Sequence, residues 1–445
     1  MNIFINKTFK RLFSLLSLFS MIVCLDWRMS QFLKPITYAT YFNHDISTIE
    51  ESENGANIIF IGASRVYRTF VPQIFEDYWN VECVINAGSS SQPLCGTYYQ
   101  LQDLIERVHP NKVYIGVTLD MLTSNAGDTP QARLIVYDRL SLKNKILMGL
   151  NCFSLKEMVF FLDTYRYNKN FNKKTIESNL KAISKLKATN YYSYSKTPEY
   201  YADKGFVYNY DTYITGTIPI MGAAYFSEEL IREDNLHYLD LCIDLCKNNN
   251  IEVNLVTGVT TVMRMYASEG YQKAVDFYNN YAKKKGIKYY NLNYLKDREN
   301  LMPDELMHDF NHVNGEGAYV VSKLFANLVN KEKKGEDISS YFYKNLADFK
   351  QDVKRIVAVR AEITVDDKDK NVRHFQMQSL YNDDVEPQYR ISIKHKGSDE
   401  FKILVDWTVD PNIDVKITEK SGFIIKVEAG TGDNLYGTAS QEYKF

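Results

Sequence analysis

Five short apolar segments alternate with predicted helices along this chain, and that alternation constrains its fold more than any other feature. Residues 57–61, 81–86 and 112–117 come early, and residues 251–257 and 287–292 come late. Each segment is a short continuous apolar run, as expected of a strand that is covered on both faces in a parallel sheet. The alternation therefore predicts a doubly wound α/β domain.

Two regions depart from this alternation and extend the predicted architecture. Residues 119–226 are rich in Tyr, Asn and Lys. Insertions at the carboxyl ends of strands commonly build a substrate pocket, although a peripheral helical decoration fits the pattern equally well. After a charged linker, residues 345–445 contain short alternating segments joined by polar turns, which predicts an antiparallel β-sandwich of roughly seven strands. We therefore expect an α/β domain over residues 50–330 with a helical insertion, followed by the sandwich.

The N-terminal residues 1–30 carry a topological signal. Lys7, Lys10 and Arg11 precede an apolar run over residues 12–25, which is shorter than the roughly 20 residues of a comfortable membrane span. No small-x-small cleavage site follows, so we expect a signal anchor rather than a cleaved signal peptide. The basic flank predicts a single-pass protein whose folded domains lie outside the cytoplasm. A lipoprotein signal and a buried N-terminal helix are the alternatives.

Composition narrows the range of ligands. The formal net charge of -2 gives no electrostatic reason to expect a nucleic-acid partner. Cys242 and Cys246 lie one helical turn apart without a second cysteine pair at zinc-site spacing, so we expect neither a metal nor a cofactor. The chain has 34 tyrosines and only 3 tryptophans. Tyrosine combines an apolar face with a hydroxyl, which suits carbohydrate, but biased composition accounts for the count as well.

A serine directly after the first predicted strand is the first candidate for chemistry. In "IIFIGASRVY", Ser64 lies two residues after Gly62. A side chain at the carboxyl end of a parallel strand points into the crevice where open α/β sheets bind ligands. The residues that follow do not complete the G-x-S-x-G nucleophile motif, and a serine in this place is ordinarily a turn or helix-cap residue.

Two later segments supply groups that a nucleophilic serine needs. Gly88 follows the second predicted strand, where its N–H could join that of Ser64 in binding a developing oxyanion. Asp309 and His312 lie three residues apart just before the last predicted helix. A carboxylate at that spacing can orient the imidazole of a general base. The neighbouring His308 is the alternative base.

Taken in this order, these segments resemble the SGNH (GDSL-type) hydrolase superfamily, over residues 57–330 without the insertion. The resemblance implies a three-layer α/β/α fold and a Ser64–His312–Asp309 catalytic triad. It also implies an oxyanion hole that contains the N–H groups of Ser64 and Gly88.

One departure from the family pattern concerns the third motif. The family has an Asn there, after a Gly, which supplies a side-chain oxyanion donor. The corresponding segment "IGVTLDML" contains Thr118 and Asp120 but no Asn. Because the loss of one such donor typically costs about 10²–10³ in rate, an acyltransferase or a slow esterase is easier to accept than a fast lipase.

This departure, the anchor and the β-module together resemble a branch of membrane-anchored, extracytoplasmic proteins that move acyl groups on cell-envelope polysaccharides. Members often work beside a multi-spanning membrane O-acyltransferase that delivers the acyl donor. We therefore expect an O-acyltransferase or acyl esterase that acts on a cell-surface polysaccharide through an acyl-enzyme, with Arg65, Tyr67 and Gln92 in the pocket wall. The sandwich would bind glycan or position the catalytic domain. The alternatives are a non-catalytic glycan-binding scaffold and a secreted esterase for small esters.

Overall fold

The structure of the chain is a computed structural model that describes residues 13–445 apart from a set of gaps. The gaps are residues 15–16, 19, 23, 27, 31–32, 35–36, 53–54, 124–128, 155, 158, 160–161, 168, 170–171, 187–198, 211–224, 297–303, 354–355, 382–384, 419–420 and 432–437.

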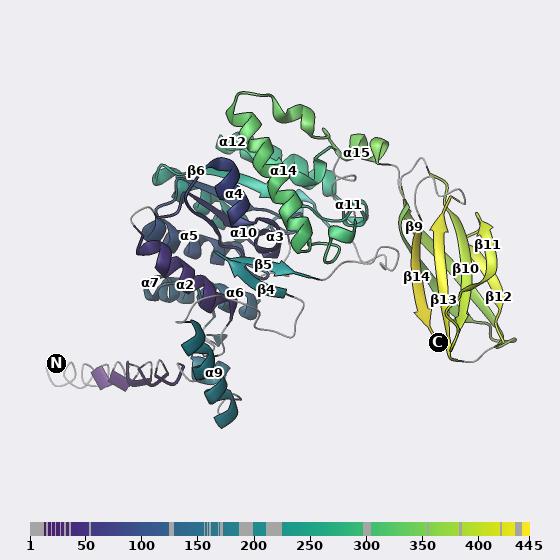
Figure 1. Cartoon of the computed structure of the whole chain (residues 1–445), viewed down its shortest axis with the longest axis horizontal. Helices are drawn as coiled ribbons and strands as arrows, with labels where there is room; N and C mark the ends of the chain where they lie inside the picture. The colour runs from purple at the N-terminus through teal and green to yellow at the C-terminus, as the bar shows by residue number, and fades with distance from the viewer. Residues whose placement is uncertain are drawn as a thin grey trace, which may run out of the picture.

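The α/β domain, drawn from purple to green in Figure 1, is built on a five-stranded sheet. The strand order is β2-β1-β3-β6-β7, and every neighbouring pair is parallel. The five segments expected from the sequence all form strands of this sheet. Their bounds are Ile58–Ile61 (β1), Val84–Asn86 (β2), Lys112–Gly116 (β3), Glu252–Thr257 (β6) and Tyr289–Asn291 (β7).

Helices cover both faces of the sheet. Successive side chains of a strand point to opposite faces, and all four residues of β1 are buried, so neither face is open to solvent at this strand. Ile59 and Ile61 share a core with α2, α5, α10 and α12, whereas Ile58 and Phe60 share the opposite core with α3, α4 and α14. These helices span Tyr38–Glu50 (α2), Ser64–Thr69 (α3), Pro72–Trp79 (α4), Leu94–Val108 (α5), Glu233–Asn248 (α10), Tyr271–Lys285 (α12) and Gly315–Lys333 (α14). The expected three-layer α/β/α architecture is confirmed.

The α/β domain begins earlier than the sequence suggested. Tyr41, Phe42 and Ile46 of α2 are buried in the first of these cores. Helix α2 is therefore part of the domain, and the expected boundary at residue 50 is too late.

The insertion contains helices, as expected, and also a β-hairpin that the sequence did not predict. Its elements are α6 (Pro130–Tyr137), α7 (Leu142–Cys152), α8 (Asp163–Arg166), α9 (Lys173–Leu186), β4 (Glu199–Asp203) and β5 (Phe206–Asn209). Polar contacts join the hairpin to helices α2 and α3 of the α/β domain. The Tyr201 hydroxyl donates to Asp45 Oδ2 of α2 at 2.5 Å, and Arg68 of α3 pairs with Glu199 at 2.5 Å. This part of the insertion is thus integrated with the domain rather than peripheral to it.

The C-terminal domain is a β-sandwich, as expected. Its two antiparallel sheets have the strand orders β11-β10-β13-β14 and β12-β9-β8, and both contribute side chains to one apolar core. The strands are β8 (Ile356–Val365), β9 (Val372–Tyr381), β10 (Gln388–His395), β11 (Lys402–Thr408), β12 (Asn412–Lys416), β13 (Phe423–Gly430) and β14 (Ala439–Lys444).

The sandwich contacts the α/β domain beside α11 (Val262–Ala267). Met263 of α11 and Ala358 of β8 are both buried, and Phe310 packs against this pair. The Tyr266 hydroxyl donates to the carbonyl oxygen of Val353 at 2.8 Å. Phe310 lies in the loop that carries Asp309 and His312, so the sandwich reaches the candidate site through one aromatic side chain.

None of the helices in the described part of the chain is long and apolar enough to cross a lipid bilayer. The anchor expected over residues 1–30 falls largely on positions outside the described residues.

Candidate functional site

Ser64 is the first residue of α3, and it follows Ile61, the last residue of β1, by three positions. The opposite end of α3 is fixed by Ser322 of α14, whose hydroxyl donates to the Thr69 carbonyl oxygen at 3.0 Å and accepts from the Val71 N–H at 2.9 Å. Helix α14, the last helix of the domain, therefore holds α3 in position.

Val66, near the start of α3, packs against three glycines at the carboxyl ends of three neighbouring strands. A Cβ on Gly62, which has φ +151°, would lie 2.9 Å from Val66 Cγ2, and a Cβ on Gly88 would lie 2.9 Å from Val66 Cβ. A Cβ on Gly116 would collide with Val66 Cγ2. Because real Cβ atoms do not approach this closely, these three positions require glycine for α3 to lie where it does.

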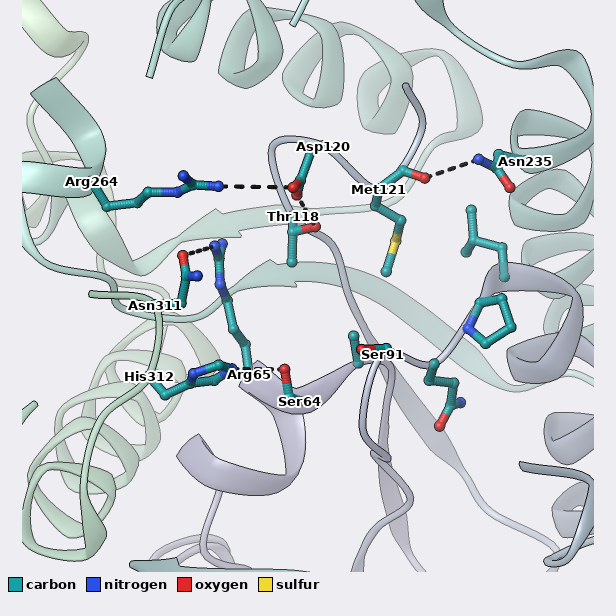
Figure 2. A pocket seen from close by; sticks show the side chains of 14 residues that line it. Ser64, Arg65, Ser91, Thr118, Asp120, Met121, Asn235, Arg264, Asn311 and His312 are labelled. Carbon is teal, nitrogen blue, oxygen red and sulfur yellow. Dashed lines mark hydrogen bonds and ion pairs between the residues drawn. The ribbon is translucent and has the colours of Figure 1, made fainter. Parts of the chain in front are cut away.

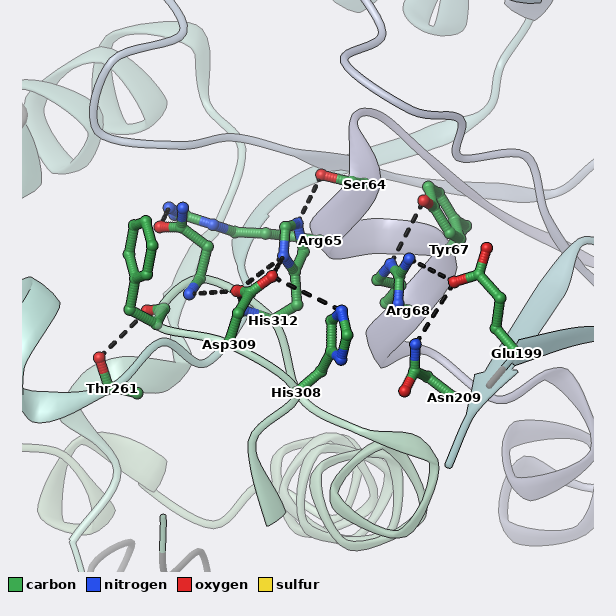
Figure 3. Close-up of polar contacts among 12 residues, drawn as sticks. Ser64, Arg65, Tyr67, Arg68, Glu199, Asn209, Thr261, His308, Asp309 and His312 are labelled. Carbon is green, nitrogen blue, oxygen red and sulfur yellow. Dashed lines mark hydrogen bonds and ion pairs between the residues drawn. The ribbon is translucent and has the colours of Figure 1, made fainter. Parts of the chain in front are cut away.

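The structure brings Ser64, His312 and Asp309 into one line of hydrogen bonds (Figure 3). Ser64 Oγ lies 2.7 Å from His312 Nε2. His312 Nδ1 lies 2.9 Å from Asp309 Oδ1 and 2.8 Å from Oδ2. An Nδ1–H that donates to the carboxylate leaves Nε2 free to accept the proton of the Ser64 hydroxyl, which is the tautomer that a general base needs.

Asp309 is held by its own loop. Its Oδ1 also accepts the backbone N–H groups of Asn311 at 2.7 Å and His312 at 2.9 Å. Burial raises the pKa of Asp309, but hydrogen bonds and the nearby imidazole outweigh burial and lower the pKa to about 2. The carboxylate therefore stays charged at neutral pH and keeps the imidazole oriented.

Burial lowers the pKa of His312 below its ordinary value of 6.5, although the hydrogen bond to Asp309 raises it. The positive charges of Arg65 and Arg68 lower it further. The imidazole is consequently neutral at neutral pH, the state in which it can take a proton.

His308, the alternative base, lies on the other side of Asp309. Its Nε2 is 3.8 Å from Asp309 Oδ2, and its backbone N–H donates to the His312 carbonyl oxygen at 2.8 Å. His312, not His308, is therefore the imidazole that the structure places against Ser64.

Gly88 packs against α3, the helix that begins with Ser64, but its N–H already has a partner. It donates to Asn86 Oδ1 at 3.2 Å, the long end of the normal range. Asn86 is fully buried, and its Nδ2 donates to the carbonyl oxygens of Val66 and Phe70. The oxyanion role of Gly88 stays a prediction, and packing against α3 is reason enough for a glycine there.

A pocket of about 280 Å³ opens beside Ser64 and His312 (Figure 2). Arg65 lines it and donates to Asn311 Oδ1 at 2.8 Å. Elsewhere in the wall, Arg264 lies 3.8 Å from Asp120. Arg65 therefore lies in the pocket wall, and its substrate-binding role stays a prediction. The lining combines these charged side chains with apolar ones such as Leu94 and Met121.

Asn311 and Arg264 were missed in the sequence. Asn311 directly precedes His312, which was a usable signal. Arg264 had no such signal, because the sequence around α11 has no distinctive pattern. Only the topology of the sheet brings this helix to the carboxyl ends of the strands.

Two other expected wall residues have different surroundings. Gln92 lines the pocket, but both ends of its amide are engaged, because Oε1 accepts from Ser89 at 2.8 Å and Nε2 donates to Thr97 at 3.1 Å. Tyr67 does not line the pocket of Ser64 and instead lines a second pocket one helical turn away.

Within the described residues, no group of three or more His, Cys, Asp or Glu side chains is placed to hold a metal ion. Cys242 and Cys246 are buried, and burial raises the pKa of each thiol.

The contact between Gly116 and Val66 is testable. We expect Gly116→Ala to displace α3, with a loss of about 1–3 kcal/mol in the free energy of unfolding, because overpacking at a close contact forces the backbone to move. The double variant Gly116→Ala/Val66→Ala should be more stable than the sum of the two single changes predicts, since it removes the colliding Cγ2. Urea unfolding of the four proteins measures this, and a Gly116→Ala protein as stable as the wild type contradicts the contact.

No protein-family model matches the sequence, and no curated protein matches it. Solved structures that are similar include a lipolytic protein of the G-D-S-L family from Desulfitobacterium hafniense DCB-2, with a TM-score of 0.31, 13% identity and coverage of 61% of this chain and 98% of the other. A GDSL-like lipase from Bacteroides thetaiotaomicron VPI-5482 has a TM-score of 0.32, 12% identity and coverage of 66% and 100%. A variant of an acetyl-xylooligosaccharide esterase from Geobacillus Stearmophilus has a TM-score of 0.30, 11% identity and coverage of 65% and 98%.

Such identities and TM-scores are too low to transfer a substrate or a reaction to this chain. The sequence and structure of this chain carry more information about its fold. The parallel sheet of five strands, the helices on both of its faces, and the order of Ser64, Gly88, Asp309 and His312 along the chain fit the SGNH fold that the sequence resembles.

Proposed function

We propose that this protein is a serine-dependent O-acyltransferase or acyl esterase that modifies an extracytoplasmic polysaccharide through an acyl-enzyme. The observation that carries the proposal is the 2.7 Å contact between Ser64 Oγ and His312 Nε2, with Asp309 behind the imidazole. A nucleophile, a base and an orienting carboxylate in this sequence form the arrangement that activates a serine hydroxyl.

In the first half of the reaction, the neutral imidazole of His312 takes the proton of Ser64 as Oγ attacks the carbonyl carbon of an acyl ester. The tetrahedral intermediate collapses when the bond to the leaving alcohol breaks and His312 returns its proton to that alcohol. The acyl group is then esterified to Ser64. Asp309, ionised throughout, stabilises the transient imidazolium.

In the second half, an acceptor hydroxyl enters beside His312, loses its proton to Nε2 and attacks the acyl-enzyme. When the bond to Ser64 Oγ breaks, His312 gives the proton back to the serine. A sugar hydroxyl as acceptor makes the reaction a transfer, and water makes it hydrolysis.

The oxyanion formed in both halves needs hydrogen-bond donors. The Ser64 N–H, at the start of α3, is the first. Gly88 can serve as the second only when its N–H releases or shares its 3.2 Å bond with Asn86. A hole with two backbone donors supports a slower enzyme than one with a third side-chain donor.

The charged and polar side chains in the pocket wall, which stand beside the apolar Leu94 and Met121, support a hydrophilic substrate, and the limited space supports a short acyl group. Arg65, Asp120, Arg264 and Asn311 line only about 280 Å³ of space. Such side chains hydrogen-bond sugar hydroxyls readily, whereas a long acyl chain needs an apolar wall. Delivery of the acyl donor by a multi-spanning membrane O-acyltransferase, and anchoring by residues 1–30, complete the proposal.

The role of the triad is tested by acetyl release from p-nitrophenyl acetate. We expect Ser64→Ala and His312→Ala each to lower the rate by roughly 10⁴ or more, down to background, because the triad acts as a unit. His308→Ala is the matched control and should keep most of the wild-type rate. Equal rates for all four folded proteins would place the chemistry elsewhere and favour a non-catalytic glycan-binding protein.

The pH dependence tests the state of His312. Because its pKa is lowered, kcat/KM should be constant around neutral pH and fall only as the pH drops through a midpoint below 6.5. Asp309→Asn should lower the rate by roughly 10⁴ and move the midpoint further down, since Asp309 raises the pKa of the imidazole. A wild-type midpoint above 6.5 contradicts a desolvated base.

Transfer and hydrolysis are separated by an acceptor experiment. With p-nitrophenyl acetate as donor, a transferase should release nitrophenol faster when an oligosaccharide acceptor is added, and acetylated oligosaccharide should appear by mass spectrometry. An esterase should yield acetate alone at an unchanged rate. Ser64→Ala, which should form neither product, is the control for uncatalysed acetylation.

A further inference from the structure

A second pocket, of about 540 Å³, lies next to the candidate active site and has no part in the reaction described above. Tyr67 and Arg68 line it, whereas Ser64 and Arg65 line the first pocket. Residues three and four apart lie on the same face of a helix, so the second pocket begins one turn of α3 beyond Ser64. Figure 3 shows the Tyr67–Arg68–Glu199 group beside Ser64 and His312.

The loop after β2 separates the two pockets. Ser89 and Ser90 line the second pocket, and Ser91 and Gln92 line the first. A chain of sugar residues that crosses this loop could therefore occupy both pockets at once.

Arg139 of the insertion is the distinctive residue of the second pocket. It is only 6% exposed, yet within the described residues its guanidinium pairs with no carboxylate and its Nε has no hydrogen-bond partner. Its Nη1 donates to the Gly88 carbonyl oxygen at 2.8 Å. Burial lowers the pKa of Arg139 to about 10, so it remains charged at neutral pH. The Phe42 ring, whose centroid lies 4.5 Å from the guanidinium carbon, offsets part of the cost of burying this charge. A buried charge without a counter-ion is still costly, and an anionic ligand would supply that counter-ion.

The other charged groups around the pocket are paired with one another. Arg166 donates to both oxygens of Asp138, at 2.9 and 3.1 Å, and Lys34 lies 3.0 Å from the same carboxylate. Glu199 accepts from Arg68 at 2.5 Å and from the Tyr38 hydroxyl at 3.2 Å. Among the described residues that line this pocket, Arg139 is thus the cationic side chain that has no carboxylate partner.

Apolar and aromatic side chains complete the wall. Tyr38, Tyr67 and Tyr167 contribute aromatic rings, of which those of Tyr67 and Tyr167 lie under the guanidinium groups of Arg68 and Arg166. Leu134 and Ile135 of α6 add aliphatic surface. Aromatic faces pack against the C–H faces of sugar rings, and a guanidinium forms paired hydrogen bonds with carboxylate or phosphate. The combination suits a ring that carries an acidic group.

We propose that this second pocket is a substrate subsite for a sugar residue that carries a carboxylate or phosphate, with Arg139 as its anion-binding group. The inference that the bound sugar is part of the substrate rests on the proposed function, whereas binding of an acidic sugar requires no catalysis. The modified glycan would then be an acidic polysaccharide, whose charged residue lies one α3 turn from the acyl-enzyme.

Calorimetric titration of the full chain carrying Ser64→Ala tests the subsite. The probes are trigalacturonate, its fully methyl-esterified form, glucose 6-phosphate and glucose. We expect at least one acidic probe to bind about tenfold more tightly, or more, than its neutral counterpart, because hydrogen bonds to charged groups are worth that much. Preference for trigalacturonate identifies the group as a carboxylate, and preference for glucose 6-phosphate identifies it as a phosphate.

Charge changes at Gln131, an exposed residue on the pocket wall, locate the binding. Gln131→Glu should weaken the acidic probe several-fold and Gln131→Lys should strengthen it. Asn249→Glu and Asn249→Lys, at the exposed C-terminal end of α10, are matched controls that should change nothing. Equal affinity for acidic and neutral probes, or no binding of any probe, overturns the proposal, as does indifference to the charge at residue 131.

The subsite and the proposed reaction fail separately. Anion binding by the Ser64→Ala protein together with no Ser64-dependent acetyl release by the wild type would leave the subsite standing and remove the acyl-transfer chemistry. Ser64-dependent acetyl release without anion binding would do the reverse.

Discussion

The contact between Val66 and three glycines is the constraint on which the candidate site depends. Gly62, Gly88 and Gly116 end or follow β1, β2 and β3, and the absence of a side chain at each lets α3 lie against the edge of the sheet. Ser64 opens that helix, so the distance from its hydroxyl to His312 is set by packing two residues away. The polar chemistry of the site thus rests on a close apolar contact.

Much of the fold was predictable because its strands are buried on both faces. Continuous apolar runs such as residues 58–61 are typical of strands that helices cover on both sides, and parallel order follows from the helices between them. The placement of Ser64 and of the Asp309–His312 pair was predictable for the same reason, since carboxyl ends of parallel strands meet at one edge. Helix α2 and the β4–β5 hairpin were not, because their partners are distant side chains rather than neighbours in sequence.

The details of the site that the sequence could not predict depend on the surroundings of individual side chains and backbone groups. Gly88 follows β2 as expected, yet its N–H turns toward Asn86. Gln92 lies in the wall as expected, yet its amide is engaged by Ser89 and Thr97. Tyr67 is three residues from Ser64 and still faces another pocket. Periodicity reports the face of an element, and it carries no information about the partner of an individual donor.

Phe310 links the C-terminal sandwich to the loop that carries Asp309 and His312. It stands between Asp309 and Asn311, and it packs against Met263 of one domain and Ala358 of the other. Its carbonyl oxygen also accepts the Thr261 N–H and hydroxyl at the start of α11. The loop that carries the base is therefore part of the seam between modules. A change in the sandwich that alters the packing of Phe310 would therefore reach the neighbouring Asp309 and Asn311, so the β-module acts as a structural support of the loop that carries His312.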